Sequence, residues 1–374
     1  MDFTPTDEQR ALGDAVRGVL SRHGSPAAET GDSAAPPPLD KALWEALVEV
    51  GVPALVWPEE DGGVGAGYTD LAAAATEIGR ARVQVPLAES VVAGALLQRT
   101  APDEVRRELL GGLSEGGALP VPAIAEPSRV WSTRPVSVVA TRGGSGSSGG
   151  GDGGWTLTGT KAPVRWAPAA THLLVTAAVE GDAGRETGVF LVDAADVSAE
   201  QVDLDGAPAT LLAAGDAADT ALAEAVALGG VVLCAEAVGA MDEALRMTTE
   251  YLRARTQFGR PLASFQALSH RAADVYAQVE LARSCALFAA MVADEQPLDV
   301  DAVLRARVAV DGAARPVGQE AIQMHGGIGV TAEYPVGHLT ARLTAITRTF
   351  GDRRQRIGEL ATRVGDHAGV SVLG

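Results

Sequence analysis

The stretch that decides the fold is Tyr251-Leu252-Arg253-Ala254-Arg255-Thr256-Gln257-Phe258-Gly259-Arg260-Pro261-Leu262-Ala263-Ser264-Phe265-Gln266. Apolar residues recur at three- and four-residue spacing on both sides of it, over 231–255 and over 265–295, which indicates two long helices. The first is expected to end at Gly259-Arg260-Pro261 and the second to begin near Ser264. Two helices of this length joined by a short turn are typical of antiparallel neighbours in a bundle.

The turn brings Arg255, Phe258 and Gln266 into one corner. A guanidinium and an amide placed together at helix ends suit the binding of a diphosphate. The alternative is an ordinary corner between helices with solvated arginines. From the residues alone that alternative is favoured.

A second stretch, Gln323-Met324-His325-Gly326-Gly327-Ile328-Gly329, follows a helical run. Its glycines let a backbone approach a ligand closely. The alternative is a helix end followed by a loop, and a single glycine cluster does not decide between the two.

Composition divides the chain into three zones. Residues 1–118 are predicted to be helical, with a start signal at Thr4-Pro5-Thr6-Asp7 and an amphipathic helix over 69–80. Residues 223–374 return to long helices and are predicted to form a four-helix bundle.

Between them, residues 119–222 contain short β-branched runs separated by turn residues, which predicts a small antiparallel sandwich or barrel. The runs are Ser137–Ala140, Trp155–Thr158, His172–Val175 and Gly188–Val192. Residues 26–38 and the Gly- and Ser-rich run 143–154 are predicted to be loops. The fold class is therefore mainly α with a small β domain.

Charge and composition exclude several functions. The formal net charge is −18, which argues against binding nucleic acid or an anionic membrane surface. The longest apolar run, 225–235, is short of the ~20 residues that span a bilayer, so no membrane insertion is expected. Cys234 and Cys285 lie in Ala-rich helical patterns and are expected to be reduced thiols. We expect a soluble cytoplasmic protein.

The two stretches, in this order and at this separation, resemble the acyl-CoA dehydrogenase family. That family carries an Arg-x-x-Phe-Gly-x-x-x-x-x-x-Gln element and a later Gln-x-x-Gly-Gly-x-Gly element in its C-terminal bundle. Three further segments look like its N-terminal turn, its flavin-side loop and its middle-domain strand: Trp57–Gly63, Ala125-Glu126-Pro127 and Trp155–Lys161. The resemblance covers nearly the whole chain.

The resemblance implies FAD as cofactor and an acyl-CoA as substrate. Arg255 and Gln266 would bind the FAD diphosphate with Phe258 packing beside the cofactor, and the adenosine half would be contacted by Gln323, Gly326 and Gly327. In this family these elements typically serve the FAD lodged mainly in the neighbouring subunit. A homo- or hetero-oligomer, dimer or tetramer, is therefore implied, with an electron-transfer flavoprotein as the electron acceptor.

The base that removes the α-proton is missing from two common positions of the family. One is the Glu of a Tyr-Glu-Gly element, where this chain has Phe350; the other falls on Gly229. The candidate that remains is Glu236, on nearly the same helix face as Gly229. It lies in an Ala-Glu-x-x-Gly element. This element resembles one in a subset of the family whose enzymes often consist of two different chains. The alternative is a solvated or salt-bridged helix glutamate, and Asp352 is a weaker candidate base.

The flavin side also departs from the family. Ala125 stands where a hydroxyl residue often reaches toward the flavin, and Ala162-Pro163-Val164-Arg165 follows Lys161 where the family often has Trp-Ile-Thr, whose indole packs on the flavin ring. Trp166 is close enough for a shifted register. Three hypotheses follow: an acyl-CoA dehydrogenase with its own FAD and Glu236 as base, a partner subunit that lends its elements to a neighbour's FAD, and a flavin-free helical assembly protein.

Overall fold

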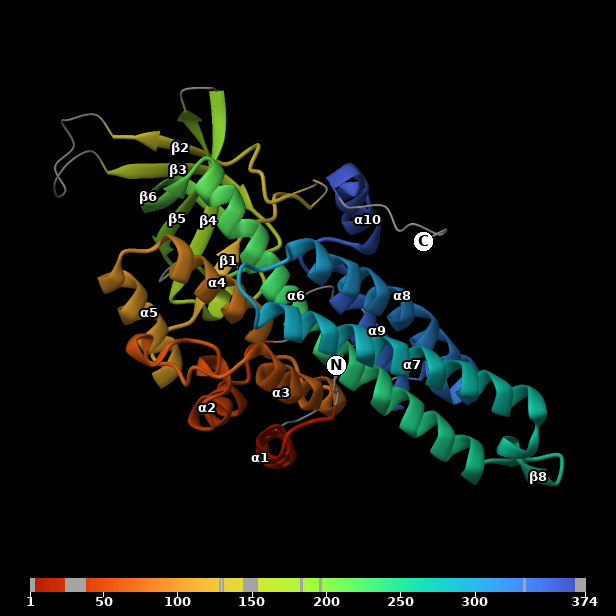
Figure 1. Cartoon of the computed structure of the whole chain (residues 1–374). Helices are drawn as coiled ribbons and strands as arrows, with labels where there is room; N and C mark the ends of the chain where they lie inside the picture. Colours follow the sequence, from red (N-terminus) through yellow and green to blue (C-terminus); the bar gives the residue numbers. More distant parts are fainter. Residues whose placement is uncertain are drawn as a thin grey trace, which may run out of the picture.

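The computed structural model describes residues 4–23, 38–127, 129, 131–143, 154–181, 184–194, 197–331 and 334–366. Nearly all of the predicted loops at 26–38 and 143–154 lies outside these residues. An N-terminal group of helices and a β barrel lie toward one end of a long helical bundle (Figure 1). The predicted fold class, mainly α with a small β domain in the middle of the chain, is confirmed.

The N-terminal helices are α1 (Asp7–His23), α2 (Lys41–Glu49), α3 (Tyr68–Ala81), α4 (Leu87–Thr100) and α5 (Asp103–Glu115). The first helix begins at Asp7, within the predicted start signal, and its cap is Thr6, not the Thr4 that precedes the proline. The hydroxyl of Thr6 accepts from the Gln9 N–H at 3.2 Å, and the Gln9 side chain accepts from the Thr6 N–H at 3.1 Å. This reciprocal capping box needs the three-residue spacing that only Thr6 has.

Six strands form the middle barrel: β1 (Pro120–Ala123), β2 (Val139–Arg142), β3 (Trp155–Lys161), β4 (His172–Gly181), β5 (Gly184–Asp193) and β6 (Val202–Ala214). The order β1-β4-β2-β3-β6-β5 closes through a further β4–β5 pairing. Most pairs are antiparallel, but β4 pairs in parallel with both β1 and β2. The patterns of β1 and β6 were not recognised in the sequence, because each contains proline and β6 carries a bulge at Gly206.

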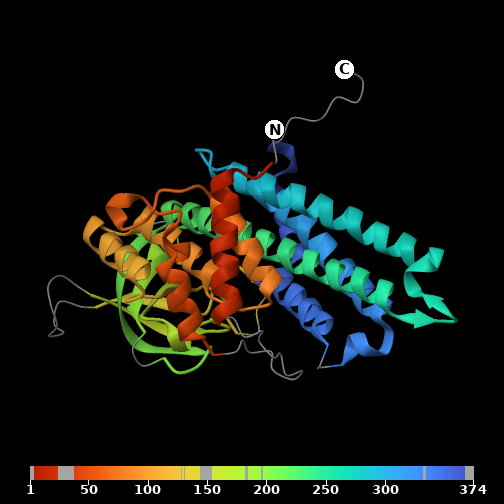
Figure 2. The ribbon, with the colours of Figure 1, turned by 90° about the horizontal axis from the view of Figure 1, so that it is seen from below.

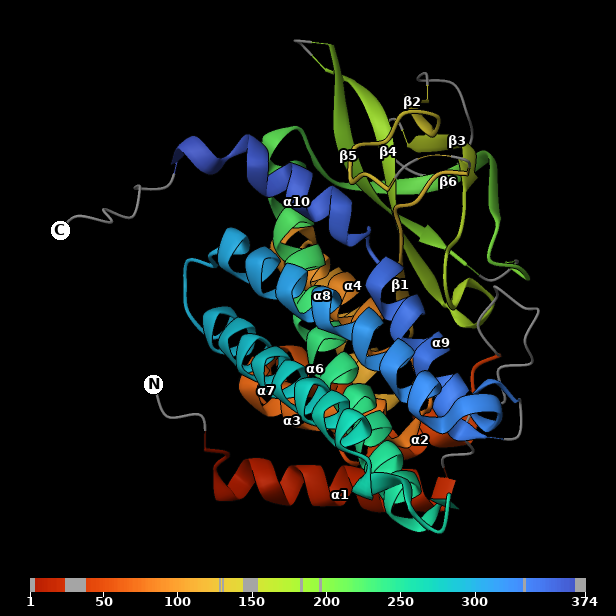
Figure 3. The same cartoon turned by 90° about the vertical axis from the view of Figure 1, so that its right-hand side faces the viewer.

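The C-terminal part contains α6 (Asp216–Ala254), α7 (Gln266–Ala293), α8 (Val300–His325), α9 (Pro335–Arg348) and α10 (Arg353–Thr362). The 39-residue α6 is the central helix. It packs against α3 and α4 as well as α7, α8 and α9 (Figures 1 and 3). It begins at Asp216, ahead of the expected boundary at 223. Figure 2 shows α1 lying across the N-terminal helices, away from the barrel.

The helices α3 and α6 touch backbone to backbone through a pair of glycines. A Cβ added at Gly79 would lie 1.9 Å from the carbonyl oxygen of Glu236, and one added at Gly239 would lie 1.9 Å from that of Thr76. Neither position has room for any side chain. This crossing fixes the part of α6 that carries Glu236.

By length and composition alone, α6 and α7 are apolar enough to cross a membrane. The most apolar window of α6 is 83% buried, as expected for the core helix of a bundle, whereas that of α7 is only 33% buried. The apolar surface of α7 therefore faces outward, with Tyr276 and Leu281 both more than half exposed.

Candidate functional site

The stretch that joins α6 to α7 forms a small hairpin at the far tip of the bundle (Figure 1). Strands β7 (Thr256–Gln257) and β8 (Arg260–Pro261) pair across a turn in which Phe258 has a φ of 53°. The Phe258 side chain is 91% exposed. Arg255 and Gln266 are exposed as well, so all three predicted cofactor residues of this stretch are open to a second molecule.

The glycine stretch begins where α8 ends. Gly326 caps α8 with a φ of 63° and opens a 3₁₀ helix, Gly326–Val330. Gln323, Gly326 and Gly327 are exposed, and a Cβ added at either glycine would meet nothing within 4 Å. Close packing inside this chain therefore does not explain the absence of side chains at these two positions.

An aromatic cluster holds the two stretches at the same end of the bundle. The rings of Tyr251, on the last turn of α6, and His325, on the last turn of α8, are stacked with centroids 4.6 Å apart. Tyr334 lies against both, 4.9 Å from His325 and 6.3 Å from Tyr251. No spacing pattern in the sequence indicates this cluster. We call the exposed surface made by Arg255, Phe258, Gln266, Gln323, Gly326 and Gly327 the outer corner.

The two positions that lack the family's base meet in space, although Gly229 lies on α6 and Phe350 in the loop between α9 and α10. A Cβ added at Gly229 would be 3.2 Å from a ring carbon of Phe350 and 2.4 Å from a methyl group of Val92. Trp131 also packs against Phe350, with ring centroids 5.8 Å apart. Hydrocarbon therefore fills the place where a carboxylate would be expected.

The loop that carries Phe350 is held rigidly. Phe350 adopts a φ of 56°, which is uncommon for a bulky residue. Arg356 donates to the carbonyl oxygens of Thr349 at 3.0 Å and Gly351 at 2.7 Å. Asp311 accepts from Arg356 at 2.7 Å and from the buried Arg307 at 3.1 Å. These contacts fix the loop in place and stabilise its left-handed residue.

Glu236 is 5% exposed and forms an ion pair with Arg342 on α9. Its Oε1 accepts from the Nε of Arg342 at 2.6 Å and lies 2.5 Å from Nη2. The salt-bridged alternative therefore describes its environment. Asp352 is a helix cap. Its carboxylate accepts from the Gln355 N–H at 2.9 Å, and the Gln355 side chain accepts from the Asp352 N–H at 2.7 Å.

Glu126, in the predicted flavin-side loop, has a role that sequence reasoning missed. Its carboxylate accepts from the backbone N–H groups of Val136, Ser137 and Val138 and from the ammonium of Lys161 at 3.3 Å. Burial acts to raise the pKa of Glu126, but the Ser137 N–H and the Lys161 charge outweigh it and hold that pKa at about 2. Burial lowers the pKa of Lys161 to about 8, against the pull of Glu126. The pair pins the loop to β3.

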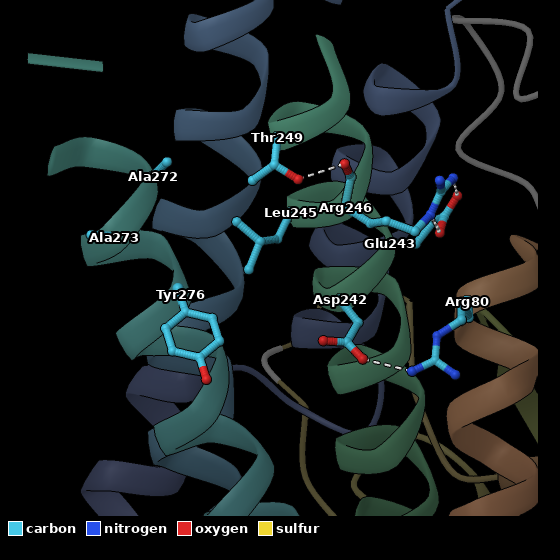
Figure 4. Close-up of a pocket in the computed structure, with 9 residues that line it drawn as sticks. All are labelled: Arg80, Asp242, Glu243, Leu245, Arg246, Thr249, Ala272, Ala273 and Tyr276. Atoms are coloured by element: carbon cyan, nitrogen blue, oxygen red, sulfur yellow. Dashed lines mark hydrogen bonds and ion pairs between the residues drawn. The ribbon is translucent and has the colours of Figure 1, made fainter. Parts of the chain in front are cut away.

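Two hollows lie away from the outer corner. A groove of about 630 Å³ runs between α3, α6 and α7 (Figure 4), and its acids and arginines neutralise one another: Asp242 pairs with Arg80, and Glu243 with Arg246. A second hollow of about 360 Å³ lies beside Phe350, between α6, α8 and α10.

Comparison with known proteins identifies the family. Residues 6–117 match the acyl-CoA dehydrogenase N-terminal domain, and residues 220–364 match the acyl-CoA dehydrogenase C-terminal domain. The chain is 33% identical over 338 residues to the acyl-CoA dehydrogenase IpdE2 of Mycobacterium tuberculosis, with 89% of each chain covered. It is 32% identical over 375 residues to FadE28 of the same organism, covering 97% of this chain and 99% of that one.

Solved structures agree. One is a Tcur3481-Tcur3483 steroid ACAD variant, with a TM-score of 0.81 and 30% identity over 96% of this chain and 98% of that chain. Another is the ChsE4-ChsE5 complex from Mycobacterium tuberculosis, with a TM-score of 0.82 and 25% identity over 99% of this chain and all of that one. The chain therefore belongs to the acyl-CoA dehydrogenase family, flavoprotein oxidoreductases that act on acyl-CoA thioesters in lipid metabolism.

Proposed function

We propose that this chain is a subunit of a heteromeric acyl-CoA dehydrogenase. It contributes residues to the FAD site of its partner and has no complete active site of its own. The observation that carries the proposal is the meeting of Gly229 and Phe350, which leaves hydrocarbon at both common positions of the base, while the outer corner is exposed. Two structural relatives are named as pairs of different proteins, which supports a heteromer.

The residues of the outer corner fit FAD bound mainly by another subunit. Arg255 and Gln266 would hold the diphosphate by charge-assisted and neutral hydrogen bonds, and Phe258 would pack beside the cofactor. The backbone at Gly326 and Gly327, with open space where side chains would be, would lie against the adenosine half beside Gln323. When bound, FAD supplies the acceptor for the β-hydride.

The base in this proposal is a carboxylate of the partner subunit, not Glu236. As a base, Glu236 would have to leave its pairing with Arg342, and the buried guanidinium would then be unpaired at a cost of roughly 3–5 kcal/mol. In the proposed heteromer Glu236 holds α6 to α9. The exposed outer corner also argues against the flavin-free assembly hypothesis.

The apolar outer face of α7 supports an oligomer. The most apolar part of α7 is only 33% buried within this chain, and exposed apolar surface on a helix is typical of a subunit contact. We propose that the complex acts in the cytoplasm and passes electrons to an electron-transfer flavoprotein.

Expression of the chain alone and together with a co-encoded acyl-CoA dehydrogenase that has the carboxylate tests the proposal. We expect no flavin and no acyl-CoA oxidation from the chain alone, and both from the pair. Oxidation by the chain alone with its own FAD would favour the first hypothesis. A stable pair without flavin would favour the assembly protein.

A further inference from the structure

A group of four charged side chains is buried where α4, α6, α9 and the segment after β3 meet. Arg165, in that segment, donates to the side chain of Gln84 at 3.0 Å, and its Nε lies 3.7 Å from Glu89 on α4. Glu236 and Arg342 form the second ion pair. Side-chain exposure is 6% for three of the four and 18% for Arg165. We call Glu89, Arg165, Glu236 and Arg342 the ionic cluster.

The two ion pairs act on each other. Burial raises the pKa of Glu89, against the pull of Arg165 and Arg342, and Glu236 raises it further. Burial likewise lowers the pKa of Arg165, against the pull of Glu89. The cluster itself has two acids and two bases and is neutral, and the half-buried Glu200 beside it also acts on Arg165 and Glu89.

The ionic cluster stabilises the core less than well-packed apolar side chains would. The Nε of Arg165, Nη1 of Arg342 and Nε1 of the neighbouring Trp166 have no hydrogen-bond partner among the residues that the structure describes. Each buried donor left unpaired costs about 1–3 kcal/mol, and well-packed apolar residues often stabilise a core more than buried ion pairs do. Stability alone therefore does not account for the cluster.

Its place in the chain suggests what it does. The N–H of Ala162 donates to the carbonyl of Ala125 at 3.0 Å, which joins the two segments that, by the family resemblance, face a subunit's own flavin ring. Arg165 belongs to one of these segments. The cluster also includes Glu236, about 10 Å along α6 from Gly229. At the Gly229 position the family's base would act on a substrate lying against that ring.

Resting on the proposed function, we infer that the ionic cluster closes this chain's own site for a flavin ring, with Arg165 as the residue that determines exclusion. A flat, uncharged ring system entering here would have to displace the Arg165 side chain. Glu89 would then lose its nearest cation while remaining buried, and the ring offers no full positive charge to replace it. FAD in the heteromer is thereby limited to the partner's side, where the outer corner contributes.

Lumiflavin, the isolated ring system without phosphate or adenosine, tests this inference. The probe is added to the heteromer saturated with FAD, and binding is followed by fluorescence quenching. We expect no saturable binding to the wild type. The double variant Arg165→Ala/Glu89→Ala, which removes a neutral pair, should bind one lumiflavin per chain, at least tenfold more tightly than any wild-type binding. Equal binding by wild type and a folded double variant would overturn the inference.

A matched control removes another buried acid–arginine pair, Asp61→Ala/Arg106→Ala, from the N-terminal helices. It should leave lumiflavin binding unchanged, and a gain of binding there would also overturn the inference. If the double alanine variant does not fold, Arg165→Ser/Glu89→Gln keeps more of the packing. If the wild-type heteromer holds no FAD, the proposed function is contradicted. The inference is still tested, because lumiflavin has no phosphate or adenosine and its binding does not depend on the outer corner.

Discussion

The outer corner and the ionic cluster share the helix α6 or its end but differ in exposure, in charge balance and in where their residues come from. The outer corner is exposed, rich in glycine with open space around it, and carries polar groups such as Arg255 that face away from the chain. The ionic cluster is buried and neutral and is formed by side chains from distant parts of the sequence. On the proposed function, the difference teaches that charged side chains can fill a chain's own half of a shared site while the half offered to a neighbour stays open.

The largest effect is expected from breaking the ionic cluster. Glu236→Gln leaves Arg342 buried without its acid and should lower the free energy of unfolding by about 3–5 kcal/mol. The folded heteromer should keep its FAD and its turnover, because the proposed function assigns the base to the partner. Urea unfolding and acyl-CoA oxidation measure the two effects.

Glu236→Gln/Arg342→Met is the matched control for this prediction. It removes both charges and should recover much of the lost stability. A loss of turnover of a hundredfold or more in Glu236→Gln, with flavin content and stability intact, would instead make Glu236 the base.

The helix crossing that carries the cluster should be almost as sensitive. Gly239→Ala places a methyl group 1.9 Å from the carbonyl of Thr76, so α3 and α6 must separate. We expect a loss of about 1–3 kcal/mol in the free energy of unfolding. Gly358→Ala on α10, where an added Cβ meets nothing within 4 Å, is the control and should be neutral or slightly stabilising. Equal stability of the two variants would show that the crossing relaxes freely.

The outer corner should respond in binding rather than in stability. Arg255→Ala is expected to weaken FAD binding by the heteromer about 10- to 100-fold, since a hydrogen bond to a charged group contributes roughly 1.5–3 kcal/mol. Thermal unfolding of the FAD-free chain should not change. Arg253→Ala, at an exposed arginine in the last turn of α6 just before Arg255, is the control. If both variants bind FAD like the wild type, the outer corner does not hold the diphosphate.

The smallest expected effect is a loss of folding stability at low pH. Because the folded-state pKa of Glu126, about 2, lies below its ordinary value of 4.5, its contribution to stability is complete above pH 4.5 and is lost as the pH falls toward 2. Urea unfolding at pH 6 and pH 3 should show this loss, and Glu126→Gln should reduce the difference. An unchanged difference in the variant would remove Glu126 as its source.

Local sequence predicted much of this molecule. Helical spacing located α6 and α7, and the β-branched runs located four of the six strands, because those signals lie within a few residues. The prolines of Pro120–Ala123 and the bulge of β6 broke the alternation on which strand prediction depends.

The site was less predictable, since its contacts join distant residues. Glu236 and Arg342 are 106 residues apart, and no spacing rule connects them. The meeting of Gly229 and Phe350, the hydrogen bonds of Glu126 and the aromatic support of the outer corner likewise arise only when the helices and the barrel pack.

The most direct test of the central claim is the number of FAD molecules per heteromer, measured by flavin absorbance after denaturation against the concentration of each chain. One FAD for every pair of chains is predicted, because the proposal leaves the partner's ring site open and closes the one in this chain. Two FAD for every pair would mean that this chain holds a flavin of its own, and would contradict the account.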